Sequence, residues 1–335
     1  MNPVSSIVVA LGAVLLLVVI AAVGAGALGL ELVFGAILPY LAIVAFLAGF
    51  VYRIVQWAKS PVPFRIPTSC GQQESLPWIK QDKLDNPSCG WGVLGRMALE
   101  VLFFRSLFRN TKAELQDGSK KLVYGSDKWL WAAGLAFHWT FLVVFLRHMR
   151  LFAEPVPGFV HLLESFDGFF QITVPAFFIT DAIILGALTY LFIRRVVLPE
   201  VRAISLPADF FPLFLLLGVA TTGVLMRYIF KVDISAVKKL SMGLLSFSFS
   251  VPEGIGVLFY IHLFLVCTLF AYFPFSKLMH MGGVFMSPTR NLANNNRKVR
   301  HVNPWDYPVK THTYDEYEEE FRKLMQSMDI PVEKE

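Results

Sequence analysis

The stretch that decides the fold runs from His262 to His280 and reads H-L-F-L-V-C-T-L-F-A-Y-F-P-F-S-K-L-M-H. It is apolar almost throughout, apart from Lys277, and it has a histidine at each end. A second apolar stretch, F-H-W-T-F-L-V-V-F-L-R-H, carries His138 and His148. An imidazole in hydrocarbon is costly unless it is hydrogen-bonded, paired or bound to a metal. Two apolar segments with two histidines each therefore indicate a ligand-holding bundle in a membrane.

The composition of the whole chain is typical of a membrane protein. Of its 335 residues, 55% are hydrophobic, and the mean hydropathy is +0.56. A helix needs about 20 mainly apolar residues to cross the hydrocarbon core. Six stretches meet this requirement, at about 4–30, 32–56, 128–152, 169–193, 208–230 and 254–279. We therefore expect an all-α integral membrane protein with a bundle of six transmembrane helices.

The positions of the basic residues predict the orientation of this bundle. The net charge of +5 is modest and does not indicate a nucleic-acid partner. Basic residues concentrate on the cytoplasmic side of membrane proteins. If the long polar loop and the tail are cytoplasmic, all but six of the 30 Lys and Arg lie inside. We expect a multi-pass protein of the cytoplasmic membrane with both termini inside. No Lys or Arg precedes Arg53, so the first helix is expected to be retained rather than cleaved as a signal peptide.

Four regions follow from this division of the chain. Residues 1–56 form a transmembrane hairpin, 57–127 a cytoplasmic loop, 128–285 a four-helix core and 286–335 a cytoplasmic tail. The loop contains an amphipathic, basic helix from Trp91, which suits either the inner membrane interface or a cytoplasmic partner.

The tail carries a short charged helix at about 314–326. Its aromatic residues favour docking on a cytoplasmic partner over a solvated tail. Two loop cysteines, Cys70 and Cys89, are either ordinary reduced thiols or thiols that face a partner's iron–sulfur cluster.

The four histidines form two predicted pairs. The third and sixth helices run antiparallel, so histidines at the same depth are His138 with His280 and His148 with His262. Haem iron accepts two axial imidazoles, so each pair is expected to hold one haem between these helices. His138 and His148 are ten residues apart, which corresponds to a rise of about 15 Å along a helix, whereas His262 and His280 are eighteen residues apart, which corresponds to about 27 Å. To reconcile these rises, we expect the sixth helix to bend at Pro274 or to end before His280.

Three further residues are candidates for the same site. Arg147 and Arg150 flank the outer pair and suit haem propionates or a quinone, although both also suit an interfacial position. Asp181, expected near mid-membrane in the fourth helix, is either a proton relay or an interhelical hydrogen-bond partner.

The two histidine spacings and the motif F-P-F-S-K-L-M-H at 273–280 resemble the nitrate reductase gamma-subunit family of dihaem cytochromes b. The resemblance covers residues 128–285 and implies the same four ligands, two haem b and a quinol site near the outer haem. The additional first helix, the 57–127 loop and the motif H-V-N-P-W-D-Y-P depart from that family. With these features the chain looks most like the DsrM subunit of the sulfite-reduction-associated membrane complex.

This resemblance implies an electron-transfer subunit of a quinone-linked oxidoreductase complex. Electrons would move between menaquinol or menaquinone and a cytoplasmic iron–sulfur subunit similar to heterodisulfide reductase, in dissimilatory sulfur metabolism. The partner would dock on the 57–127 loop and the tail, and other membrane and periplasmic subunits are expected. The alternatives are a nitrate reductase gamma-type subunit that oxidises quinol, and a membrane anchor or transporter without haem.

Overall fold

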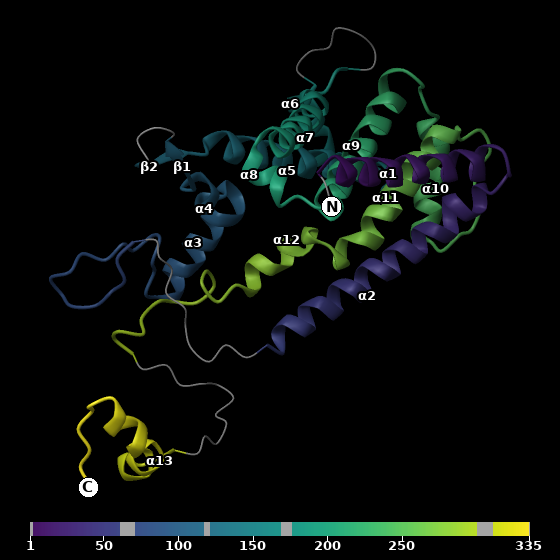
Figure 1. Cartoon of the computed structure of the whole chain (residues 1–335). Coiled ribbons are helices and arrows are strands. Elements are labelled where there is room, and N and C mark those ends of the chain that lie inside the picture. The colour runs from purple at the N-terminus through teal and green to yellow at the C-terminus, as the bar shows by residue number, and fades with distance from the viewer. Residues whose placement is uncertain (1–2, 61–70, 117–120, 169–175, 300–310, 335) are drawn as a thin grey trace.

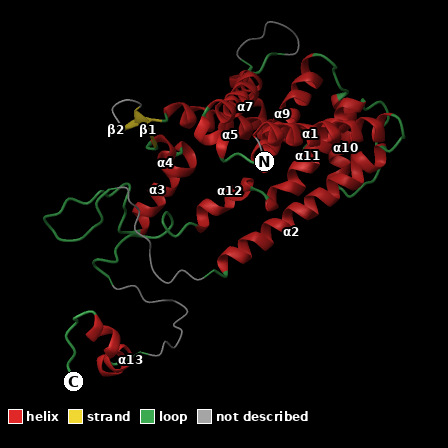
Figure 2. Ribbon diagram, in the orientation of Figure 1, coloured by secondary structure: helices red, strands yellow, loops and turns green. Residues whose placement is uncertain are grey.

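The computed structural model describes residues 3–60, 71–116, 121–168, 176–299 and 311–334. Helices make up most of this part of the chain, and a single two-stranded sheet completes its regular structure (Figure 2). The long helices gather in one bundle; α4, Arg105–Phe108, lies beside α5, Lys128–His148, and α13, Tyr314–Ser327, lies apart from the bundle (Figure 1). The predicted all-α membrane architecture is therefore confirmed in its coarse form.

Among the described residues, five helices are long and apolar enough to cross a membrane. They lie at Pro3–Gly26, Val33–Ala58, Lys128–Leu151, Pro207–Tyr228 and Val257–Phe275. The first is α1 and the fourth is α9. The second is a π-helical turn, Val33–Ile37, followed by α2, Leu38–Ala58; the third is α5, Lys128–His148, and the fifth is α11, Val257–Tyr272, each followed by a 3₁₀ turn. The remaining expected span corresponds to α7, Ile179–Val197, which carries Asp181, Arg194 and Arg195 within 19 residues. Because of these charged residues, α7 is less apolar than the other five helices.

The predicted fourth helix, 169–193, differs from α7 in its limits. Residues 169–175 lie outside the described part, and Phe178 just before α7 is extended. Tertiary contacts hold this approach: the Tyr228 hydroxyl accepts the Phe178 N–H at 2.9 Å, and Arg227 donates to the Ala176 carbonyl at 3.0 Å. Asp181 consequently lies in the first turn of α7.

The sixth predicted helix ends before His280. Regular α11 stops at Tyr272, a 3₁₀ turn spans Phe273–Phe275, and Ser276 is extended with φ −123° and ψ 177°. Proline has no N–H to donate and its ring clashes with the preceding turn, so Pro274 ends the helix here. A second 3₁₀ turn leads to His280, the first residue of α12, His280–Gly283. The expected end of the regular helix before His280 is confirmed.

The N-terminal hairpin packs on the histidine-bearing bundle. Helix α1 contacts α9 and α11, α2 contacts α11, and α7 lies between α5 and α9. A buried cluster around Tyr260, Leu240 and Phe34 joins the hairpin to the outer end of α11. A second cluster, around Leu188, Leu215 and Leu265, joins α7, α9 and α11. The hairpin is thus a structural layer of the bundle.

The segments outside the long helices contain short elements. The expected amphipathic helix is α3, Gly90–Phe103, and α4, Arg105–Phe108, follows it directly. An unpredicted antiparallel hairpin pairs β1, Thr111–Gln116, with β2, Lys121–Ser126. The charged tail helix is α13, Tyr314–Ser327, and begins with a capping box between Thr313 and Glu316. The other short helices are α6, Gly158–Asp167, α8, Pro199–Ala203, and α10, Ile234–Leu245.

Candidate functional site

The inner pair of histidines, His138 and His280, lies where α5 meets the start of α12. Their ring centroids are 5.8 Å apart and the ring planes are inclined by 81°. His138 Nδ1 bonds the Gly134 carbonyl at 2.7 Å, and His280 Nδ1 bonds the Lys277 carbonyl at 2.9 Å. Each imidazole is therefore held by a carbonyl of its own chain segment.

The outer pair, His148 and His262, joins the far end of α5 to α11. Their ring centroids are 6.5 Å apart and the planes are nearly parallel, at 10°. His148 Nδ1 bonds the Val144 carbonyl at 2.7 Å, whereas His262 Nδ1 lies 2.9 Å from the Thr222 hydroxyl of α9. That hydroxyl donates to the Gly218 carbonyl at 2.7 Å, so it accepts the proton of His262 Nδ1.

All four histidines thus share one arrangement: Nδ1 is engaged and Nε2 is left for another ligand. A histidine that binds a metal usually donates its other N–H to a carbonyl or similar acceptor. Imidazole nitrogen binds transition metals at about 2.0–2.1 Å, so two rings on opposite sides of one ion have centroids roughly 6 Å apart. The observed 5.8 and 6.5 Å fit this requirement. Both pairs therefore have the donor chemistry and spacing that axial ligation of a haem iron requires.

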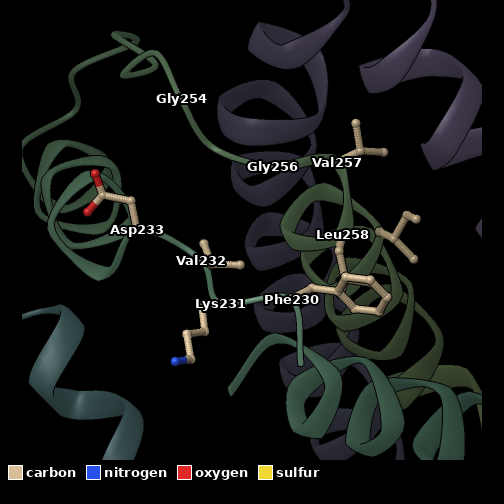
Figure 3. A pocket seen from close by; sticks show the side chains of 9 residues that line it. Phe230, Lys231, Val232, Asp233, Gly254, Gly256, Val257 and Leu258 are labelled. Carbon is tan, nitrogen blue, oxygen red and sulfur yellow. The ribbon is translucent and has the colours of Figure 1, made fainter. Parts of the chain in front are cut away.

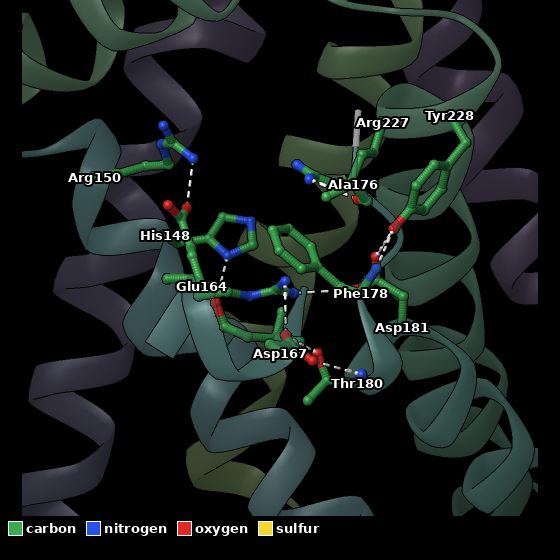
Figure 4. Close-up of polar contacts among 12 residues, drawn as sticks. His148, Arg150, Glu164, Asp167, Ala176, Phe178, Thr180, Asp181, Arg227 and Tyr228 are labelled. Carbon is green, nitrogen blue, oxygen red and sulfur yellow. Dashed lines mark hydrogen bonds and ion pairs between the residues drawn. The ribbon is translucent and has the colours of Figure 1, made fainter. Parts of the chain in front are cut away.

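Next to the outer pair lies a buried network of ion pairs (Figure 4). Arg147 contacts Asp167 at 2.9 Å and Asp181 at 3.1 Å. The Tyr228 hydroxyl donates to the second oxygen of Asp181 at 2.9 Å. The guanidinium groups of Arg147 and Arg227 both lie against the Phe178 ring, at 3.9 and 3.8 Å from its centroid. Buried charges are tolerated when they are paired, and this network ties α5, α6, α7 and α9 together.

The three other predicted site residues therefore have protein partners. Arg147 is buried between two carboxylates, and Asp181 bridges Arg147 and Tyr228. Arg150 lies one turn outward and pairs with Glu164 of α6. Asp181 accepts an interhelical hydrogen bond from Tyr228, which is one of the two roles that the sequence predicted for it.

An open groove of about 460 Å³ lies at the outer end of α11 (Figure 3). Its walls are the turn after α9, from Phe230 to Asp233, and the first turn of α11, with Val257, Leu258 and Ile261. Ile261, which lines the groove, immediately precedes His262 in the sequence. Lys231 is the basic side chain of its lining.

The loop and the segment after α12 form one packed unit (residues 71–100 and 287–298), which we call the cytoplasmic unit after the side of the membrane that the sequence predicts for it. Asn294 donates from its backbone to the Pro87 carbonyl at 2.8 Å and from its side chain to Asn86 at 2.5 Å. Lys298 bonds Glu74 at 2.8 Å, and this contact lowers the pKa of the Glu74 carboxyl.

Cys89 is exposed on this unit, at the start of α3. Cys70 and the aromatic residues Trp305 and Tyr307 lie outside the described residues.

Sequence reasoning missed the residues on other helices that contact His262, Arg147 and Asp181. Thr222, Asp167 and Tyr228 have no spacing relation to the histidine motif, and threonine is common in membrane helices. A buried charge near a ligand position is a usable signal. That signal was available for Asp167, which the sequence places in a short polar loop.

Comparisons with known proteins identify the family of the chain. The model of a family described as nitrate reductase gamma subunit matches residues 88–301. The chain is 47% identical over 281 residues to the "Hdr-like menaquinol oxidoreductase cytochrome b-like subunit" of Archaeoglobus fulgidus, covering 82% of this chain and 83% of that protein. It is 43% identical over 276 residues to the protein of the same description from Archaeoglobus profundus, covering 80% and 81%.

Proposed function

We propose, from the premise that this chain belongs to the nitrate reductase gamma-subunit family, that it moves electrons across a membrane with two haem b groups. Its relatives are cytochrome b-like subunits of menaquinol oxidoreductases. The chain is accordingly a multi-pass membrane subunit of the cytochrome b type. The proposed axial ligands are His138 with His280 at the inner site and His148 with His262 at the outer site.

The observation that carries this proposal is the shared geometry of the four imidazoles. In each pair, both Nδ1 atoms are engaged by a carbonyl or hydroxyl, and the ring centroids are 5.8 or 6.5 Å apart. Six-coordinate iron with two histidines favours electron transfer over oxygen chemistry. When bound, the two haems would supply one-electron transfer between the two faces of the membrane.

The outer pair is proposed to face menaquinol or menaquinone. The groove at Phe230–Asp233 is mostly apolar, with Lys231 as a polar contact, which suits a quinone ring. Asp181 is proposed to move a proton at its Oδ2, the atom that accepts the Tyr228 hydroxyl. Arg147 is proposed to hold the Asp181 carboxylate in place, and Arg150 that of Glu164. Both guanidinium groups would present positive charge to haem propionates or to quinone.

The inner pair is proposed to face a cytoplasmic iron–sulfur subunit similar to heterodisulfide reductase. The cytoplasmic unit joins the loop and the post-α12 segment into one surface, and Cys89 is exposed on it. The exposed aromatic face of α13, Tyr317 and Phe321, would extend this docking surface. The sulfur-metabolism role and the DsrM-like assignment belong to this proposal, with further membrane and periplasmic subunits as partners.

The proposed topology has six spans in the cytoplasmic membrane, with α7 as the fourth span and both termini inside. In α7, Asp181 is paired with Arg147, and Arg194 is paired with Asp127 at 2.8 Å. These ion pairs reduce the cost of placing the charges of α7 in the bundle.

The experiment that tests the function is a reduced-minus-oxidised visible spectrum of the purified chain and of two histidine variants. His280→Ala is expected to remove one of two low-spin b-type haems and to leave the outer one. His161→Ala, on α6 and outside both pairs, is the matched control and is expected to keep both. A wild-type chain without a b-type band would refute the proposal and favour a haem-free anchor.

A nitrate reductase gamma-type subunit is the second candidate, because the family model that matches is that of the nitrate reductase gamma subunit. The soluble protein that purifies with the chain separates the two. A heterodisulfide reductase-like partner supports the first candidate, and a nitrate reductase catalytic subunit supports the second.

A further inference from the structure

One contact of the inner pair comes from the cytoplasmic loop. The Phe104 ring lies 4.9 Å from the His138 ring, centroid to centroid, with the planes at 87°. Phe104 is half-buried and stands between α3 and α4, far in sequence from the histidine motif. It is therefore not one of the residues that the spacing of the histidines points to.

The backbone at this position is strained. Phe104 has φ 51° and ψ 48°, the left-handed region that bulky side chains rarely adopt and that glycine adopts freely. Such outliers persist only when the surrounding structure imposes them, and they gather at functional sites. Here the residue under strain is the one whose side chain touches a proposed ligand.

Phe104 lies in the junction between α3 and α4, which we call the corner (residues 100–108). Hydrogen bonds join the corner to α5 on both sides of His138. The indole N–H of Trp131 donates to the Phe103 carbonyl at 2.8 Å, and that of Trp139 donates to the Leu102 carbonyl at 3.0 Å. These bonds satisfy carbonyls at the end of α3, which a helix leaves unpaired. Within the corner, the Glu100 carboxylate accepts the N–H of Ser106 at 2.9 Å and its hydroxyl at 2.7 Å.

Further contacts fix the depth of the corner along α5. Lys128 donates to the Phe108 carbonyl at 2.6 Å and lies 3.3 Å from the centroid of the Phe108 ring. Leu107 packs beside Gly134, the residue whose carbonyl holds His138 Nδ1. The corner thus covers the inner half of α5 from the carbonyl anchor of His138 to its ring.

We infer that Phe104 is a positioning residue for the inner site: it fixes the plane of the His138 imidazole and shields that site from cytoplasmic water. His138 lies between the Phe104 ring and the Phe137 ring, each 4.9 Å from it, so two aromatic contacts restrict its rotation. Exposure of a haem and the orientation of its ligands both tune its potential. The inference rests on the proposed function, because it concerns the haem that His138 would hold.

The test compares the electron paramagnetic resonance spectrum and the potentiometric titration of wild type with those of four variants. Phe104→Gly removes the ring and accommodates the backbone, and Phe104→Ala removes the ring alone. Both are expected to shift the inner low-spin signal and to lower the reduced-to-oxidised ratio of that haem roughly threefold or more at fixed potential. The outer signal is expected to stay unchanged.

Two controls separate this role from a general effect on folding. Phe104→Tyr keeps the ring and is expected to retain the wild-type inner signal. Phe103→Ala changes a neighbouring side chain that is 54% exposed and is expected to leave both signals unchanged. An unaltered inner signal in Phe104→Gly, in protein that carries both haems, would overturn the inference and spare the proposed function. Wild-type protein without haem would overturn both.

Discussion

The hydrogen bond between Thr222 and His262 gives the sharpest test of how the outer site is built. Thr222→Val keeps the shape of the side chain but removes the oxygen that accepts the Nδ1 proton of His262, 2.9 Å away. A buried donor left without a partner costs about 1–3 kcal/mol. Loss of a supporting bond to a metal-binding histidine typically weakens metal affinity by about 10–100-fold.

The two magnitudes agree, since a tenfold change in affinity corresponds to about 1.4 kcal/mol. We therefore expect Thr222→Val to release the outer haem about 10–100-fold more readily, with the inner haem unaffected. The assay is haem transfer to excess apomyoglobin, followed separately for the two haems by their spectra.

Thr140→Val is the matched control for this experiment. Thr140 is 6% exposed and Thr222 is 8% exposed, and both hydroxyls donate to carbonyls three and four residues earlier at 3.0 and 2.7 Å. Among the described contacts, only the Thr222 hydroxyl reaches a histidine. Equal release of the outer haem from Thr222→Val and Thr140→Val would refute the argument that Thr222 positions His262.

Three other predictions concern the rest of the molecule. Because the ligand planes are inclined by 81° in the inner pair and 10° in the outer pair, paramagnetic resonance should show two low-spin ferric signals, the inner one more anisotropic; a single signal type contradicts this. Asp181→Asn leaves Arg147 with one carboxylate, and loss of a buried ion-pair partner costs about 3–5 kcal/mol; the thermal midpoint and the rate of quinol-dependent reduction should both fall, whereas an unchanged rate argues against a proton role. In the tail, backbone N–H groups of Glu333 and Lys334 lower the pKa of the Glu318 carboxyl. A lowered folded-state pKa means that this stabilisation is present near neutral pH and is lost as the pH falls through that value; the amide resonances of Glu333 and Lys334 should report the loss, and Glu318→Gln should abolish its pH dependence.

The long apolar stretches were enough to predict most of the bundle. Hydropathy gave the five strongest spans, and the break after Tyr272 followed from Pro274, which ends a helix by local chemistry alone. Antiparallel topology was enough to expect the two inner histidines to meet and the two outer ones to meet. These features depend on short-range chemistry and on helix direction, both of which are encoded locally.

The missed features depend on contacts between distant segments. The first turn of α7 begins at Ile179 because Tyr228 and Arg227 of α9 hold the extended residues before it. Phe104 acquires its role through two indoles of α5, and nothing in the 91–109 stretch specifies them. The β1–β2 hairpin is different, because the sequence D-G at 117–118 is by itself a recognised hairpin signal.

The central claim is that the chain carries two haem b groups, one on each histidine pair. The most direct measurement is haem b per polypeptide in purified wild type, in His280→Ala and in His148→Ala. We expect two haems in wild type and one in each variant, with different spectra because different sites remain. No haem in wild type, or the same remaining spectrum in both variants, would contradict it.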